Sequence, residues 1–163
     1  MKNKSGFITL IVGIVFFAIV IVLVVVDSLV GNSYKLVNNT DKNITSLTVF
    51  FDDDEGEYST DIFDGQLAAG ETVKGKYETI DCTNADRTCS ALVEFEGEEE
   101  MYIYGGYFVG KYNGNVSFEF YCENGEYRLA MNSGVGLFNV KKDSGMEDVI
   151  YFDFDNDEWD YVE

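Results

Sequence analysis

The stretch that decides the fold is residues 115–131, which read NVSFEFYCENGEYRLAM. Apolar and polar side chains alternate on both sides of its centre, and a period of two is typical of a strand with one buried face. The centre is Asn124-Gly125, a dipeptide that accepts positive φ and favours a two-residue hairpin loop. We therefore predict a β-hairpin. Its inward positions are Val116, Phe118, Phe120 and Cys122 on the first strand and Tyr127, Leu129 and Met131 on the second.

The alternation of apolar and polar residues also occurs before and after residues 115–131. Asn113-Gly114 predicts a second two-residue hairpin loop, between strands at residues 107–112 and 115–121. Eight to ten short strands at this spacing predict an all-β domain, either an immunoglobulin-like β-sandwich or a small open barrel. The other expected strands are Tyr34–Val37, Thr45–Phe51, Val73–Tyr77, Ala91–Phe95, Met101–Tyr104, Phe138–Val140 and Val149–Phe154.

An uncharged run precedes this domain. Residues 7–26 read FITLIVGIVFFAIVIVLVVV, which as a helix spans about 30 Å, the hydrocarbon thickness of a bilayer. We predict one N-terminal transmembrane α-helix at residues 6–30. Lys2 and Lys4 lie before it, and by the positive-inside rule residues 1–5 form a cytoplasmic tail. Residues 31–163 would then be an extracytoplasmic domain of a single-pass protein of the cell membrane.

Two other fates of this segment stay open. A signal peptidase cut near Val26-Asp27-Ser28 would release the domain. The junction Gly6-Phe7, after a short basic leader, resembles that of type IV pilin-like proteins, whose mature chains begin with Phe. The resemblance covers about eight residues and implies a processed filament subunit. The fifth mature residue would be Ile11, where that family has glutamate.

The charge of the chain restricts its partners. It has 30 acidic and 11 basic residues and a net charge of −19. Such a field repels nucleic acid and anionic lipid headgroups, so we expect the domain to stand off the bilayer and to favour cations or basic surfaces. The chain has no histidine, which excludes Ser-His-Asp and Cys-His catalysis and histidine-ligated metals. We expect no enzymatic activity.

Three cysteines suggest a crosslink. Cys82 and Cys89 flank a polar segment, Thr83–Thr88, which we expect to be a loop, and outside the cytoplasm they could form a disulfide. Cys122 falls on the apolar face of its strand, where a buried thiol is expected. Bridges from Cys122 to Cys82 or to Cys89 remain alternatives.

Acidic clusters lie at residues 52–55, 98–100 and 153–158. The spacing Asp153-x-Asp155-x-Asp157 is that of the start of an EF-hand loop, but Glu158 stands where that loop needs glycine. We expect solvated acidic loops and no cofactor, with a calcium ion shared between loops as the alternative.

An aromatic cluster occupies residues 101–108, MYIYGGYF. Tyrosines offer an apolar ring and a hydroxyl, so Tyr102, Tyr104, Tyr107 and Tyr112 are the candidate binding face. The alternative is that the glycines kink a strand and the tyrosines pack across it. The function expected is a non-enzymatic binding or accessory module for a protein or envelope component. The alternative is a pilin-like filament subunit processed at Gly6-Phe7.

Overall fold

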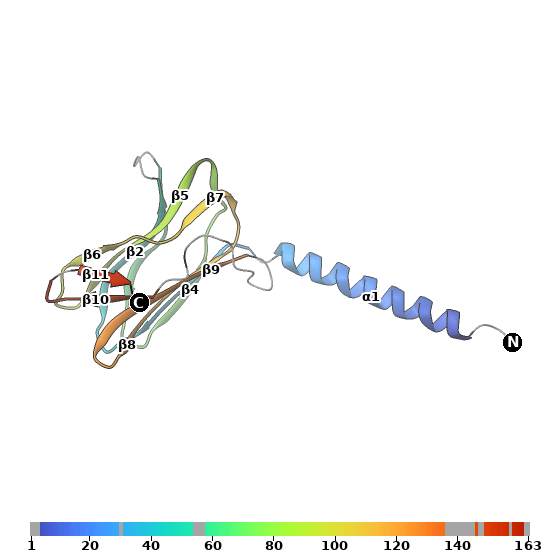
Figure 1. Ribbon diagram of the computed structural model, residues 1–163, viewed down its shortest axis with the longest axis horizontal. Helices are drawn as coiled ribbons and strands as arrows, with labels where there is room; N and C mark the ends of the chain where they lie inside the picture. Colours follow the sequence, from blue (N-terminus) through green and yellow to red (C-terminus); the bar gives the residue numbers. More distant parts are fainter. Residues whose placement is uncertain are drawn as a thin grey trace.

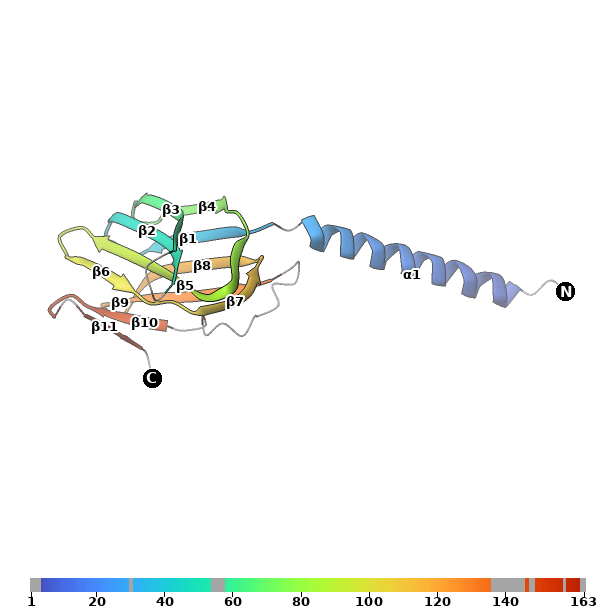
Figure 2. The same ribbon diagram turned by 90° about the horizontal axis from the view of Figure 1, so that it is seen from above.

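The computed structural model describes residues 4–29, 31–53, 58–135, 146, 149–156 and 158–161. Within them the chain forms one helix and then eleven β-strands in two sheets (Figures 1 and 2). The elements are α1 (Lys4–Leu29), β1 (Ser33–Asn39), β2 (Ile44–Asp52), β3 (Ser59–Leu67), β4 (Thr72–Lys76), β5 (Ile80–Phe95), β6 (Glu100–Ile103), β7 (Tyr107–Tyr112), β8 (Asn115–Glu123), β9 (Glu126–Gly134), β10 (Val149–Asp153) and β11 (Glu158–Tyr161).

Helix α1 is 26 residues long and extends away from the sandwich (Figures 1 and 2). Its side chains are described from Leu10 to Leu23, a stretch of 14 residues, and all of them are exposed. A helix that packed on the sheets would bury one face, so α1 makes no such packing over this stretch. Among the described residues, no helix is long and apolar enough to cross a membrane.

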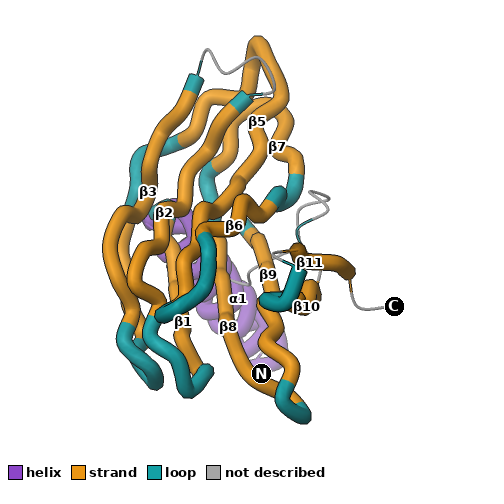
Figure 3. The backbone as a smooth tube through the Cα atoms, turned by 90° about the vertical axis from the view of Figure 1, so that its left-hand side faces the viewer, coloured by secondary structure: helices purple, strands orange, loops and turns teal. Residues whose placement is uncertain are grey.

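The strands form an all-β sandwich, as the alternation predicts. The first sheet, sheet A, has the order β11-β10-β9-β8-β1-β4. Strand β1 lies inside this sheet, parallel to β8 and antiparallel to β4. The second sheet, sheet B, has the order β3-β2-β5-β6, and β7 pairs with β5 beyond the end of β6. Figure 3 shows β6 and β7 following one another along this edge.

Aromatic side chains from both sheets fill the core. Phe95 of sheet B lies 5.3–5.8 Å from the rings of Phe120, Phe152 and Phe154 from the sheet A side. Edge-to-face pairs of this kind add about 0.5–1.5 kcal/mol each to the free energy of burial. At one side the two sheets are also joined by a hydrogen bond, because Nε1 of Trp159 on β11 donates to the carbonyl of Tyr102 on β6 over 2.7 Å.

The two Asn-Gly pairs have different structures. Asn124 and Gly125 have φ of 56° and 88°, so the predicted hairpin loop between β8 and β9 is confirmed. The second predicted hairpin is wrong, because β7 belongs to sheet B and β8 to sheet A. Gly114 crosses between the sheets, and a Cβ atom there would lie 2.3 Å from the carbonyl oxygen of Gly134. This glycine therefore serves a close backbone approach rather than a tight turn.

Three strand segments gave no signal in the sequence. Strand β3 buries only Ile62 and Leu67 of its nine residues, so it lacks alternation. Strand β11 lies at the edge of sheet A, where it pairs with β10. The expected loop Thr83–Thr88 is also wrong, because β5 runs through it with a register shift between Cys82 and Arg87. The expected strand Phe138–Val140 lies outside the described residues.

Candidate binding surface

Two small polar residues are buried on the outer side of sheet B. On β5, Cys89 and Ala91 face the core, so the alternation turns Thr88 and Ser90 outward. Yet Thr88 is only 2% exposed and Ser90 is 0% exposed. Other side chains must therefore cover this part of the outer surface.

Tyrosines provide the cover. The hydroxyl of Tyr102 donates to Oδ2 of Asp52 over 3.2 Å and lies 3.0 Å from Oγ of Ser90. Tyr107 pairs with Thr88 across the β5–β7 ladder, and its ring lies 5.5 Å from that of Tyr104 in a T-shaped contact. Tyr102 and Tyr107 remain 44% and 43% exposed. We call Tyr102, Tyr104 and Tyr107 the tyrosine surface.

Two glycines explain why these rings share one surface. A Cβ atom on Gly105 would lie 1.8 Å from the carbonyl oxygen of Cys89, so the chain can pass this close to β5 only with glycine here. The amide of Cys89 donates to the carbonyl of Gly106 over 3.2 Å. The edge of sheet B thus continues from β6 to β7 through a kink at these glycines.

Tyr112 does not belong to the candidate face, and its assignment there is wrong. It is 0% exposed, its ring centroid lies 4.2 Å from that of Phe108, and its hydroxyl donates to the carbonyl of Asn115 over 2.7 Å. The physical reason is the period of the strand. Tyr107 and Tyr112 are five residues apart, so they point to opposite sides of β7. Burial raises the pKa of Tyr112.

The tyrosine surface carries a carboxylate. Burial raises the pKa of Asp52, and the hydrogen bonds from Tyr102 and Ser90 oppose that shift. Beside it, Oγ1 of Thr88 is buried without a hydrogen-bond partner among the described residues. The surface therefore combines aromatic faces with oxygen acceptors, which suits ammonium, guanidinium or amide groups.

Sequence reasoning missed several members of this region. Asp52 and Ser90 lie far from the tyrosines in sequence, and only the β2–β5–β6 pairing brings the three segments together. On β7, Val109 is 62% exposed and lies two residues after Tyr107, so both side chains point to the same side of the strand. This outward period would have indicated Val109.

The register separates Cys82 from Cys89. Cys82 lies opposite Gly110, whereas the amide of Cys89 bonds to Gly106. Four residues along β7 correspond to about 13 Å, and disulfides need Cα atoms about 4.4–6.8 Å apart. The structure has both residues as buried thiols, so the predicted bridge is not formed in it. Burial raises the pKa of Cys89.

Cys122 is exposed, so the expectation of a buried thiol is wrong. Its strand buries Val116, Phe118 and Phe120, and Cys122 continues the same row. It lies past the end of the core, however, beside the hairpin loop at Asn124. Alternation predicts which face of a strand a side chain lies on. It does not predict where the opposing sheet ends, and burial depends on that sheet.

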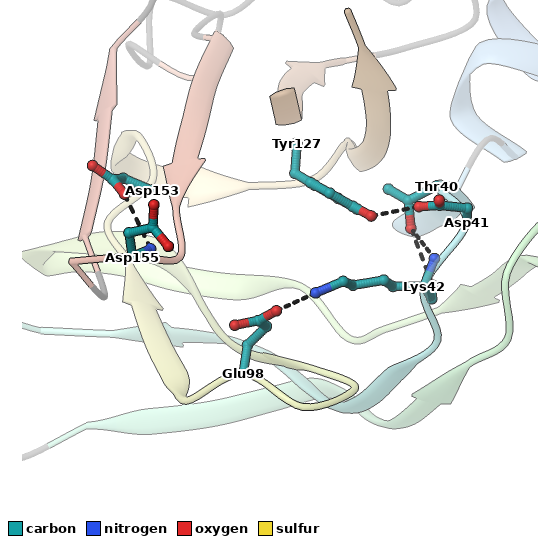
Figure 4. A network of polar contacts seen from close by, with 7 residues as sticks. All are labelled: Thr40, Asp41, Lys42, Glu98, Tyr127, Asp153 and Asp155. Carbon is teal, nitrogen blue, oxygen red and sulfur yellow. Dashed lines mark hydrogen bonds and ion pairs between the residues drawn. The ribbon is translucent and has the colours of Figure 1, made fainter. Parts of the chain in front are cut away.

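A second polar cluster surrounds the loop between β1 and β2 (Figure 4). Nζ of Lys42 pairs with the carboxylate of Glu98 and lies 4.8 Å from the ring centroid of Phe154 and 5.5 Å from that of Tyr127. The hydroxyl of Tyr127 donates to Oδ1 of Asp41 over 2.5 Å, which raises the pKa of Tyr127 to about 12. A lysine thus supplies the positive charge among these loops.

The acidic loops do not form a metal cluster in the part of the chain that the structure describes. No group of three or more Asp, Glu, Cys or His residues there could hold a metal ion. The carboxylate of Asp153 accepts instead from the amide of Asp155 and the side chain of Asn156, over 3.1 and 2.8 Å. Asp54, Glu55 and Asp157 lie outside the described residues, and a shared calcium ion stays a prediction.

No protein-family model, curated protein or solved structure matches the chain significantly.

Proposed function

We propose that this chain is a membrane-tethered, extracytoplasmic binding module whose tyrosine surface captures another protein or an envelope component. The tether is α1. Its sequence has twenty residues without a charge, from Phe7 to Val26, and its described side chains are exposed on all sides of the helix. A helix that is apolar all round needs an apolar environment, and a bilayer provides one. Lys2 and Lys4 support a cytoplasmic N-terminus.

The observation that carries the binding role is the tyrosine surface. Tyr102 and Tyr107 are large amphipathic side chains, and each remains more than 40% exposed on a rigid sheet edge. Tyrosine is enriched at binding hot spots, because it offers large contact area at low cost in conformational entropy. Two packed sheets of mostly antiparallel strands also support an immunoglobulin-like class for the domain.

The chemistry of the surface favours a basic partner. Asp52 offers a carboxylate beside the tyrosine rings, and the net charge of the whole chain is −19. Lysine and arginine side chains can pair with the carboxylate and stack on tyrosine rings. We propose binding and no reaction at this surface.

Photocrosslinking in the native membrane tests this proposal. The full chain would carry p-benzoylphenylalanine in place of Tyr107, or in place of Asn132, an exposed residue of β9 in the other sheet. We expect one discrete crosslinked partner from position 107 and none from position 132. Equal products at both positions, or none at either, would count against a specific face.

The tether is tested separately by extracting the same membranes at alkaline pH and sequencing the N-terminus of the retained chain. We expect the chain in the pellet, with residue 7 not at its N-terminus. A mature chain that begins at Phe7 would favour the filament subunit instead. A soluble chain would show that α1 does not anchor it.

A further inference from the structure

Three of the described lysines of the domain lie together on sheet A. Lys35 on β1 lies directly opposite Lys74 on β4, and Lys76 on β4 lies opposite Ser33. All three lysine side chains are exposed and face the outer side of sheet A. We call Lys35, Lys74 and Lys76 the lysine face.

The lysine face concentrates positive charge on an acidic domain. Like charges directly opposite each other on a ladder are destabilising, and here they occur in a chain with 30 acidic residues that could have neutralised them. Among the described basic residues of the domain, Lys42, Arg87 and Arg128 have carboxylate partners, whereas the lysine face and Lys111 have none. No ion pair joins the lysine face to a described carboxylate within 4.0 Å.

The lysine face also lies close to the end of α1. Helix α1 ends at Leu29 and β1 begins at Ser33, so three residues join them. Three residues span at most about 10 Å. Lys76 is level with Ser33, and Lys35 and Lys74 are two residues, or about 7 Å, further along the ladder. Sheet A is therefore the sheet that begins beside the helix, as Figures 1 and 2 show.

The residues at the start of β1 are bonded to the rest of the sandwich. The amide of Ser33 donates to the carbonyl of Gly114 over 3.2 Å, and its hydroxyl lies 2.6 Å from Oδ1 of Asn115. Asn32 is 5% exposed, and its side-chain amide donates to Thr79 over 3.3 Å. The bonded part of the domain therefore begins within three residues of the end of α1.

From these observations, and resting on the proposed membrane tether, we propose that the lysine face docks on the anionic headgroups of the membrane that holds α1, and so orients the domain on the bilayer. The expectation that the acidic domain stands off the bilayer considers only the net charge of the domain. Charges act locally, because the Debye length is about 8 Å at physiological ionic strength.

Screening favours the nearby lysines over the distant carboxylates. The loop that contains Asp41 follows Asn39, which lies four residues, or about 13 Å, beyond Lys35 along β1. That is more than one Debye length of about 8 Å, so the charge of this loop is partly screened at the lysine face. Two carboxylates lie nearer and oppose the attraction in part: Glu78, exposed and two residues after Lys76, and Glu119, which faces outward on β8 opposite Val37.

Lysine footprinting on the full chain tests this. The chain would be reconstituted in nanodiscs of phosphatidylcholine alone, or with added phosphatidylglycerol, and the rate of acetylation at each lysine would be measured by mass spectrometry. Lys111 is the internal control, because it is exposed on β7 of the opposite sheet. With phosphatidylglycerol we expect acetylation of the lysine face to slow by at least about threefold and Lys111 to be unchanged, since anionic lipid attracts nearby lysines. Salt at 1 M, where the Debye length is about 3 Å, should abolish the difference.

A double variant with reversed charges provides a second experiment. Lys74→Glu with Lys76→Glu should remove the protection of Lys35, whereas Lys111→Glu should leave it intact. Equal acetylation of the lysine face in the two lipids, with the chain retained in the discs, would overturn the docking but not the tether. A chain that the discs do not retain would overturn the tether, and the docking with it.

Discussion

Nη1 of Arg87 lies 2.6 Å from Oδ2 of Asp53, and both side chains are almost buried, at 12% and 11% exposure. The guanidinium also stacks on Tyr58, 4.0 Å from its ring centroid. The pair joins β5 to the end of β2. It thereby fixes the part of β5 where the register shifts.

Arg87→Met should destabilise the domain by about 3 kcal/mol, because it leaves a buried carboxylate uncompensated. The matched control is Arg128→Met, whose partners Glu123 and Glu126 are 54% and 60% exposed, and which should cost about 1 kcal/mol or less. Urea unfolding of the full chain in detergent, followed by the fluorescence of Trp159, measures both. Equal losses would mean that the Arg87 pair is solvated.

Gly105→Ala should destabilise the domain by about 3 kcal/mol, because its Cβ atom would collide with the carbonyl of Cys89 and the edge of sheet B would have to move. Gly31→Ala meets nothing within 4 Å and should change stability by less than about 0.5 kcal/mol. The same unfolding assay compares them. If Gly105→Ala is tolerated like Gly31→Ala, the kink between β6 and β7 does not have the backbone approach described above.

Tyr107 and Tyr112 should behave in opposite ways. Tyr107→Ser should weaken partner binding by about tenfold, as expected for a hot-spot tyrosine, and leave stability nearly unchanged. Tyr112→Phe should cost about 1 kcal/mol of stability, because the carbonyl of Asn115 loses its donor, and should leave binding unchanged. Binding is measured with the partner recovered by crosslinking. Loss of binding in Tyr112→Phe with a stable fold would reinstate Tyr112 in the binding surface.

The pKa of Tyr127 gives a pH prediction. The hydrogen bond to Asp41 raises it to about 12, so the folded state keeps this proton longer than the unfolded state, in which a tyrosine has a pKa of about 10. The contribution to stability is full below pH 10 and is lost as the pH rises through about 12. Asp41→Asn should bring the pKa of Tyr127 down toward about 10, measured by NMR of ¹³C-labelled tyrosine. The control is Glu119→Gln. The carboxylate of Glu119 accepts a hydrogen bond from Asn39, and its removal should leave the pKa of Tyr127 unchanged.

Alternation predicted the sandwich because most strands have one face in a common core, as β8 does. It failed for β3, which buries two residues of nine, and for the crossing at Gly114, where a turn-like dipeptide serves a close approach between sheets. The tyrosine surface was foreseen only in part. Composition identified Tyr102, Tyr104 and Tyr107, but the carboxylate beneath them comes from β2, some fifty residues earlier. Such long-range pairing leaves no local mark in the sequence.

The interior position of β1 has a mechanical consequence. Its ladders run with seven residue pairs to β8 and five to β4. If α1 is held and a captured partner pulls on the domain, the load enters at Ser33 along the axis of β1. The hydrogen bonds on both sides lie across that axis, so they share the load in shear instead of opening one at a time. A strand at the edge of the sheet would share it with one neighbour only. The first strand of the domain is thus placed to keep the sandwich folded under tension.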